Sequence, residues 1–138
     1  MSVAPTGGVG AIKFKYFSKY MSKAQHKSFS PADETRKFEH GQADIIDIGM
    51  GKVGRLTLQP GWKWSNDVKP IAQTEWCEAP HFQYHANGTL HVKMQDGEEF
   101  EVQAGEVSFL PSGHDAWVVG DEPVVLIDWA GTDKYAKE

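Results

Sequence analysis

The sequence predicts an all-β protein, built as an antiparallel sandwich or barrel. Short runs that suit β-strands follow one another at roughly regular spacing, at residues 72–77, 80–86, 89–95, 98–103, 106–110, 115–119 and 123–129. Turn signals separate most of these runs: Asn87-Gly88, Asp96-Gly97, Gly105, Pro111-Ser112-Gly113 and Gly120-Asp121. Many short strands with such punctuation are typical of antiparallel sandwiches and barrels.

Length and composition suit one domain and argue against several classes of partner. A chain of 138 residues with 40% hydrophobic residues has enough apolar mass for one core. The formal net charge is −5 and there is no long basic stripe, which argues against nucleic acid or an anionic membrane as the main partner. No apolar run approaches a membrane span, and the first residues lack the pattern of a signal peptide. Because the single cysteine excludes an internal disulfide, we expect a cytoplasmic protein.

The first 28 residues are expected to form an extension, followed by the domain over residues 29–138. Residues 1–10 are rich in Gly, Pro and Ala and are expected to fray. Residues 12–17 suit either an edge strand or a short amphipathic helix, because the run is too short for its periodicity to decide. Ser30-Pro31, with the acidic residues Asp33 and Glu34 in the first turn, predicts the start of a short helix.

Strand character begins at Ala43 and ends at Pro60-Gly61, where two indoles follow. Trp62 and Trp64 flank a single lysine just after the turn. Two indoles this close are most simply a lid over the edge of the core, with their N–H groups near water. The alternative is an aromatic rim that stacks on a ligand.

The Asn87-Gly88 pair predicts a two-residue hairpin between the runs on either side of it. Directly opposed residues of a hairpin lie on one face of the sheet. The predicted pairs are His85 with Leu90, Gln83 with Val92, and His81 with Met94. Since the three partners are apolar, this face is predicted to be the interior.

An interior face that carries imidazoles needs something to satisfy them. Burying an unpaired polar group costs roughly a few kcal/mol, and a metal or a polar ligand would remove that cost. If the strand continues unbroken across Pro80, Cys77 and Glu75 lie on the same inner face as His81.

Two stretches resemble the sequence motifs of the cupin superfamily. The pattern Gly105-x5-Pro111-x-Gly113-His114 resembles the second motif, and the stretch from Glu75 to Gly88 resembles a degenerate form of the first. Residues 30–130 as a whole are similar to a group of small single-domain bacterial cupin proteins. The resemblance implies a cupin-type antiparallel β-barrel, or jelly roll, with a short N-terminal extension. It also implies that a homodimer is plausible.

The resemblance also implies a set of metal ligands, with departures from the usual pattern. The first motif of metal-binding cupins supplies His, His and Glu. Counting back from Gly88, these places are taken by Glu75, Cys77 and His81. In the second motif Ala116 stands where the usual His is found.

His114 stands two residues before that alanine, so it shares a face with it and could replace the missing ligand. The implied metal set is therefore Cys77, His81 and His114. These ligands suit Zn²⁺ or Fe²⁺ better than Mg²⁺ or Ca²⁺, and three of them leave a position open. Glu75 is either a fourth ligand or a base beside the site.

Two further groups are candidates for contact with a small-molecule ligand. Gln83 could orient such a ligand or merely satisfy His81. The indoles of Trp62, Trp64 and Trp117 could stack on it, and the bulk of Trp117 would narrow the mouth of the barrel.

Simpler interpretations stand beside these. Cys77 could be core filler, and His114 could cap its loop. Two functions therefore stay open: a metal-dependent enzyme acting on a small organic molecule, and a non-catalytic module that binds or senses one. Ala116 favours the second. An interaction domain that pairs through edge strands is a third, but it leaves the inward polar cluster unexplained.

Overall fold

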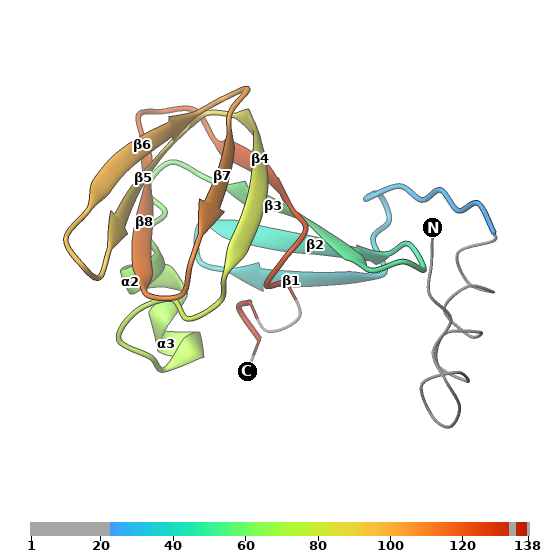
Figure 1. The fold of residues 1–138 in the computed structure, drawn as a ribbon, viewed down its shortest axis with the longest axis horizontal. Helices are drawn as coiled ribbons and strands as arrows, with labels where there is room; N and C mark the ends of the chain where they lie inside the picture. Colours follow the sequence, from blue (N-terminus) through green and yellow to red (C-terminus); the bar gives the residue numbers. More distant parts are fainter. Residues whose placement is uncertain (1–22, 133–134, 138) are drawn as a thin grey trace, which may run out of the picture.

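In a computed structural model, which describes residues 23–132 and 135–137, the chain forms two antiparallel sheets packed face to face (Figure 1). The six-stranded sheet has the order β1 (Glu34–Phe38), β2 (Gly41–Asp47), β3 (Lys52–Leu58), β9 (Val124–Asp128), β4 (His81–Asn87) and β7 (Val107–Leu110). The three-stranded sheet has the order β6 (Glu99–Gln103), β5 (Thr89–Met94) and β8 (His114–Val119). This jelly-roll sandwich confirms the predicted all-β class. The predicted structure of residues 12–17 lies outside the described residues.

Alternating side chains along the strands build one core between the sheets. In β8 and β9 every second residue is buried, as the period of two predicts. Leu58 and Leu126 contribute from the larger sheet and Val92 from the smaller one, each 2% exposed or less. The polar residues that share these inward positions are therefore held in an apolar surrounding.

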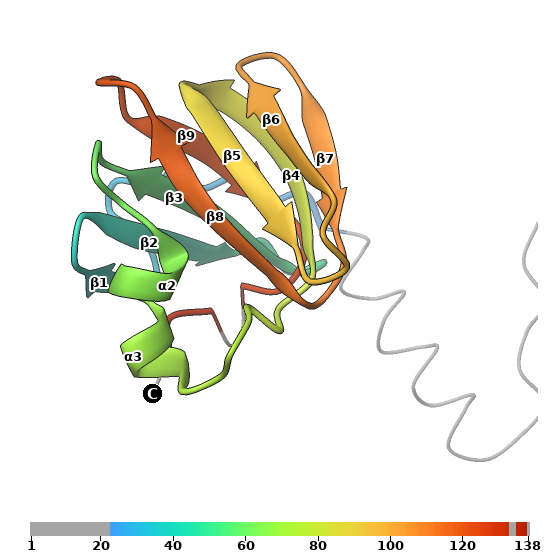
Figure 2. The ribbon, with the colours of Figure 1, turned by 90° about the vertical axis from the view of Figure 1, so that its left-hand side faces the viewer.

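Two short helices lie at one end of the sandwich (Figure 2). They are α2 (Trp64–Asp67) and α3 (Lys69–Ala72). Among the described residues no helix is long and apolar enough to cross a membrane. The C-terminal residues lie on the side of the molecule where α3 is found, as both views show.

Two predicted elements are wrong. Residues 72–77 are not a strand, because α3 ends at Ala72, Gln73 takes a left-handed conformation with φ of 58°, and Cys77 makes only an isolated bridge to His114. The predicted helix after Ser30 is also wrong. Glu34 begins β1 and pairs with Ile45 of β2, so sheet pairing overrides the local signal for a helix start.

The predicted hairpin at Asn87-Gly88 is wrong as well, although its conclusion about the interior holds. The β4 strand pairs with β7 and β9, whereas β5 pairs with β6 and β8, so the chain changes sheets at this turn. Gly88 has φ of 80°, and a Cβ there would lie 2.5 Å from the Pro123 carbonyl oxygen, so the crossing needs glycine. Both strands keep their alternation, and the inward residues face one another across the sandwich.

Candidate metal centre

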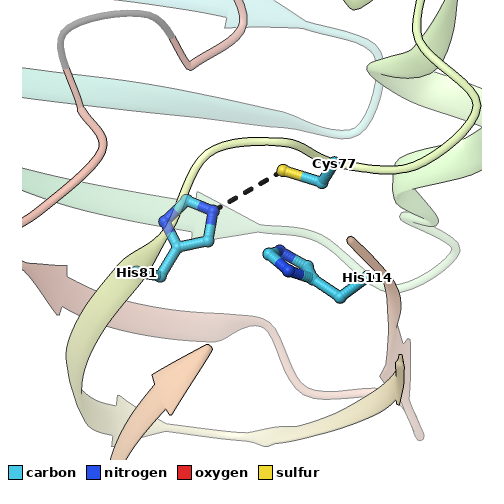
Figure 3. A group of neighbouring side chains, drawn as sticks. All are labelled: Cys77, His81 and His114. Carbon is cyan, nitrogen blue, oxygen red and sulfur yellow. Dashed lines mark hydrogen bonds between the residues drawn. The ribbon is translucent and has the colours of Figure 1, made fainter. Parts of the chain in front are cut away.

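Three buried side chains from distant parts of the chain converge near one end of the core. The ligand atoms of Cys77, His81 and His114 all lie within 4.8 Å of one another, and each residue is 3% exposed. His81 is the first residue of β4 and His114 the first of β8, while Cys77 lies in the loop before β4. Figure 3 shows the three side chains turned toward a common point.

Backbone hydrogen bonds fix the loop that carries Cys77 against the start of β8. The Cys77 amide donates to the His114 carbonyl at 2.8 Å, and the Gly113 amide donates to the Cys77 carbonyl at 2.8 Å. Because these bonds join the backbones of two members of the cluster, the thiol and one imidazole are positioned by the same bridge.

The orientation of His81 is set by Asp128 of β9. Nδ1 of His81 lies 2.5 Å from Oδ2 of Asp128, which is fully buried. The other carboxylate oxygen accepts backbone amides of Phe82 at 3.2 Å and Ala130 at 2.9 Å, so the carboxylate itself is held. With Nδ1 donating to the carboxylate, Nε2 of His81 is turned toward the Cys77 sulfur, 3.7 Å away.

A backbone carbonyl does the same for His114. Its Nδ1 donates to the Pro111 carbonyl oxygen at 2.9 Å, which leaves Nε2 available to the cluster. The His81 and His114 rings meet edge to face with centroids 5.2 Å apart. Ligating histidines in proteins usually donate their other ring N–H to a carboxylate or a carbonyl, and both histidines here do so.

The cluster shifts its own titration in the metal-free protein. Burial raises the pKa of the Cys77 thiol, but hydrogen bonds to His114 and His81 outweigh burial and lower the pKa from 9.0 to about 6. Burial lowers the pKa of His81, but hydrogen bonds to Asp128 and Cys77 outweigh it and raise the pKa from 6.5 to about 9. The surroundings thus favour a thiolate, which is the form of cysteine that binds metals.

The donor set fits a divalent ion of borderline softness. One thiolate and two imidazoles with their outer nitrogens satisfied are ligands typical of Zn²⁺ or Fe²⁺. The inner cavity that the cluster borders has a volume of about 20 Å³. It is lined by Leu56, Leu58, Trp62, Trp64, Cys77, His81, Gln83, Leu90, Leu110, His114, Ala116, Leu126 and Tyr135. The three ligands therefore face a small space in which a further ligand can complete the coordination.

Glu75 does not join the cluster. Its side chain is 80% exposed and forms an ion pair with Lys69 at 3.3 Å. The expected inner position assumed an unbroken strand, but this segment is an irregular loop, so alternation does not carry Glu75 inward. Its expected role as a ligand or base at the metal is corrected accordingly.

The three tryptophans divide between the inside and the outside of the sandwich. Trp62 and Trp64 are 3% and 2% exposed and line the inner cavity, so neither is an exposed rim. The expectation that their N–H groups lie near water is wrong for Trp62, whose Nε1 is buried with no hydrogen-bond partner in the part of the chain that the structure describes. Trp117 faces outward, stacked on His91 with centroids 4.4 Å apart and covered by Lys63, so it does not narrow the cavity.

Gln83 lies where the sequence predicts, on the inner face of β4. It is 2% exposed and lines the inner cavity, and its Oε1 is buried with no hydrogen-bond partner among the described residues. Ala116, in place of the usual cupin histidine, borders the same cavity. Its methyl group leaves this side of the cavity without a third imidazole as a fourth ligand.

Two residues of the site were missed from the sequence. Asp128 shares the inward alternation of Val124 and Leu126, and this pattern was available as a signal. Tyr135 is 5% exposed and its ring lies 5.5 Å from that of His81, but its segment has no periodicity to reveal this.

A second and larger pocket adjoins the inner cavity. It has a volume of about 580 Å³ and lies between α2, α3, the loop that carries Cys77 and the C-terminal residues. Trp64, Cys77 and Tyr135 border both spaces. These three side chains therefore separate the pocket from the inner cavity, and one of them, Cys77, belongs to the metal cluster.

Comparison with solved structures finds the same architecture in oxalate decarboxylases. The enzyme from Lactobacillus farciminis, in its formate complex, matches with a TM-score of 0.54 and 23% identity, over 74% of this chain and 32% of that one. The Bacillus subtilis enzyme at pH 4.6 matches with a TM-score of 0.52 and 26% identity, over 75% of this chain and 28% of that one.

The chain thus spans about a third of the length of these enzymes or less. No protein-family model matches the chain, and no curated protein sequence matches it. The matched regions are cupin domains. The structural similarity shows that the chain has the cupin fold.

Proposed function

We propose that this protein is a metal-binding cupin that binds or converts a small organic molecule beside a divalent ion, Zn²⁺ or Fe²⁺. The observation that carries the proposal is the convergence of Cys77, His81 and His114, with both imidazoles oriented by buried acceptors. A bound ion of this kind would supply Lewis-acid chemistry.

The residues of the chain have distinct parts in this proposal. The Asp128 carboxylate holds His81 in the tautomer that presents Nε2, and the Pro111 carbonyl does so for His114. Cys77 contributes the anionic ligand. Apolar side chains around the cluster exclude water, which strengthens the electrostatic interactions inside it.

The organic molecule is proposed to bind in the pocket of about 580 Å³, since the inner cavity of about 20 Å³ is too small for it. Ligand pockets commonly measure about 300–1,000 Å³. A molecule in the larger pocket would contact Cys77, Trp64 and Tyr135, the wall shared with the cluster. The free thiol of Cys77 supports the proposal of a reducing, cytoplasmic location.

Metal analysis of protein purified without a histidine tag tests the proposal. We expect about one equivalent of metal per chain in the wild type and a loss of most of it in Cys77→Ser and His114→Ala. His91→Ala is the matched control, because His91 lies on the outer face and pairs with Glu99 at 2.8 Å. Less than about a tenth of an equivalent in the wild type after reconstitution would contradict the proposal.

A non-catalytic binding or sensing module is the second candidate. The inner cavity has no Asp, Glu, Lys or Arg among its described lining residues, so any proton transfer there would fall to the three metal ligands themselves or to Tyr135. Tryptophan fluorescence titrated with small metabolites, with and without a chelator, separates the two. Binding without turnover that survives chelation would favour this second candidate.

A further inference from the structure

The inner cavity is small, and the described residues that line it carry no charge apart from the metal cluster. No lysine or arginine is among the described residues that line it. Arg36 is buried nearby, but its guanidinium is held by Glu34 and by the carbonyls of Thr132 and Tyr135. Any charge that a ligand brings into the cavity must therefore be balanced by the cluster itself.

The cluster with a divalent ion is already neutral. The Cys77 thiolate and the fully buried Asp128 carboxylate supply two negative charges, which match the two positive charges of the ion when both histidines are neutral. A neutral ligand preserves this balance, and a singly charged anion leaves one net charge. A dianion would leave two net negative charges in an apolar surrounding, at high energetic cost.

Two polar atoms in the lining have no hydrogen-bond partner among residues 23–132 and 135–137. Oε1 of Gln83 is a buried acceptor and Nε1 of Trp62 a buried donor, and both residues border the cavity. Each unsatisfied group costs free energy that a polar ligand can recover. The cavity volume of about 20 Å³ is room for one or two water-sized groups.

From charge, size and these two groups we infer that the inner cavity takes a neutral or singly charged ligand of water-like size and rejects dicarboxylates. Gln83 and Trp62 are positioning residues that hydrogen-bond this ligand beside the ion. The inference rests on the proposed function, because it requires the bound ion. It separates this chain from the oxalate decarboxylases that it resembles in fold, since oxalate is a dianion.

Cobalt-substituted protein tests the inference through its visible spectrum, with no need for activity. We expect azide to shift the Co²⁺ spectrum and oxalate at the same concentration to leave it unchanged. Trp62→Phe should bind one Co²⁺ and weaken azide about tenfold or more, because it removes an N–H donor to a charged ligand. Gln83→Leu should also bind one Co²⁺ but leave the azide affinity unchanged, because azide has no hydrogen to donate to Oε1. Gln83→Leu should fold, since it deletes a buried carbonyl oxygen that has no partner among the described residues. Gln103→Leu, on the exposed side of β6, is the matched control.

The outcomes distinguish the two levels of the proposal. With a full complement of Co²⁺ bound, any of three results would overturn this inference alone: an oxalate response equal to that of azide, no azide response, or an unchanged azide affinity in Trp62→Phe. Failure of the wild type to take up Co²⁺ would overturn the proposed function and the inference together.

Discussion

The Asp128 carboxylate and the His81 imidazole, 47 positions apart in the sequence, form a buried pair with 2.5 Å between Oδ2 and Nδ1. The pair joins β9 to the first residue of β4, two neighbouring strands of the larger sheet. It fixes which nitrogen of His81 faces the cluster, and so it links the geometry of the sheet to the chemistry of the proposed site.

Removing the charge of Asp128 should weaken metal binding. We expect Asp128→Asn to lower metal affinity about 10–100-fold, because the amide is uncharged and has one acceptor oxygen in place of two, so it favours the ligating form of His81 less. Competition with a chromophoric chelator measures the change. Asp44→Asn is the matched control, since Asp44 is also buried but contacts Thr35 and Arg55 instead. Equal metal affinities in the two variants would contradict this role.

In the metal-free protein, Cys77 should ionise at a lower pH than an ordinary thiol. The thiolate absorbance, measured against Cys77→Ser, is expected to titrate near pH 6 rather than near 9.0. A midpoint near the ordinary value would show that the imidazoles do not stabilise the thiolate.

The pKa shifts of Cys77 and His81 should together make the stability of the metal-free protein depend on pH. The Cys77 pKa is lowered, so its contribution is full above pH 9.0 and is lost as the pH falls through about 6. The His81 pKa is raised, so its contribution is full below pH 6.5 and is lost as the pH rises through about 9. The difference in unfolding free energy between wild type and Cys77→Ser should therefore be largest between pH about 6 and about 9.

Arg36 should hold the C-terminal residues against the sandwich. Its Nη1 donates to the carbonyls of Thr132 at 2.6 Å and Tyr135 at 2.7 Å. Arg36→Lys cannot reproduce both bonds, and we expect it to lose about 1–3 kcal/mol of unfolding free energy in a urea titration. Hydrogen exchange at Tyr135 should quicken in this variant and stay slow in Arg55→Lys, whose arginine pairs with Asp44. Unchanged hydrogen exchange at Tyr135 in Arg36→Lys would contradict this role of Arg36.

An exposed aromatic surface at the sheet edge should support weak self-association. Phe82 of β4 is directly opposite Phe109 of the edge strand β7, and the rings of Phe82 and Trp129 lie 6.1 Å apart. These residues and Tyr84 are 38–66% exposed. At about 200 Å² each they offer roughly 400 Å² per copy, about half of what a stable interface buries.

We therefore expect a concentration-dependent homodimer in analytical ultracentrifugation, and its loss in Phe109→Lys. Met50→Lys is the control. Met50 is 71% exposed and lies in the turn between β2 and β3, which β9 separates from β4 and β7 in the sheet. A monomer at all concentrations would contradict the prediction.

Alternation and turn signals were enough to predict the fold class and the inward face of β4, because the period of two is a local property of a strand. The pairing of β4 was not predictable in this way. Asn87-Gly88 has the chemistry of a tight hairpin, and only the Pro123 backbone beside it shows that the chain crosses to the other sheet.

Within the site, the ligand set Cys77, His81 and His114 was implied by the resemblance to the cupin motifs. The expectation for Glu75 was wrong because it presumed an unbroken strand across Pro80. Trp117 failed for a different reason. Trp117 directly follows the inward residue Ala116, so alternation predicts that Trp117 faces outward. The expectation that Trp117 narrows the mouth of the barrel did not apply this rule. Tyr135 depends on a contact that no local pattern records.

The placement of Asp128 on the last strand has a consequence for the order of assembly. The thiol, the two imidazoles and this carboxylate can meet only when β9 has inserted between β3 and β4. Capture of an ion with full affinity would therefore report that the whole chain topology is complete, and a nascent or truncated chain lacking β9 would leave the ion weakly held.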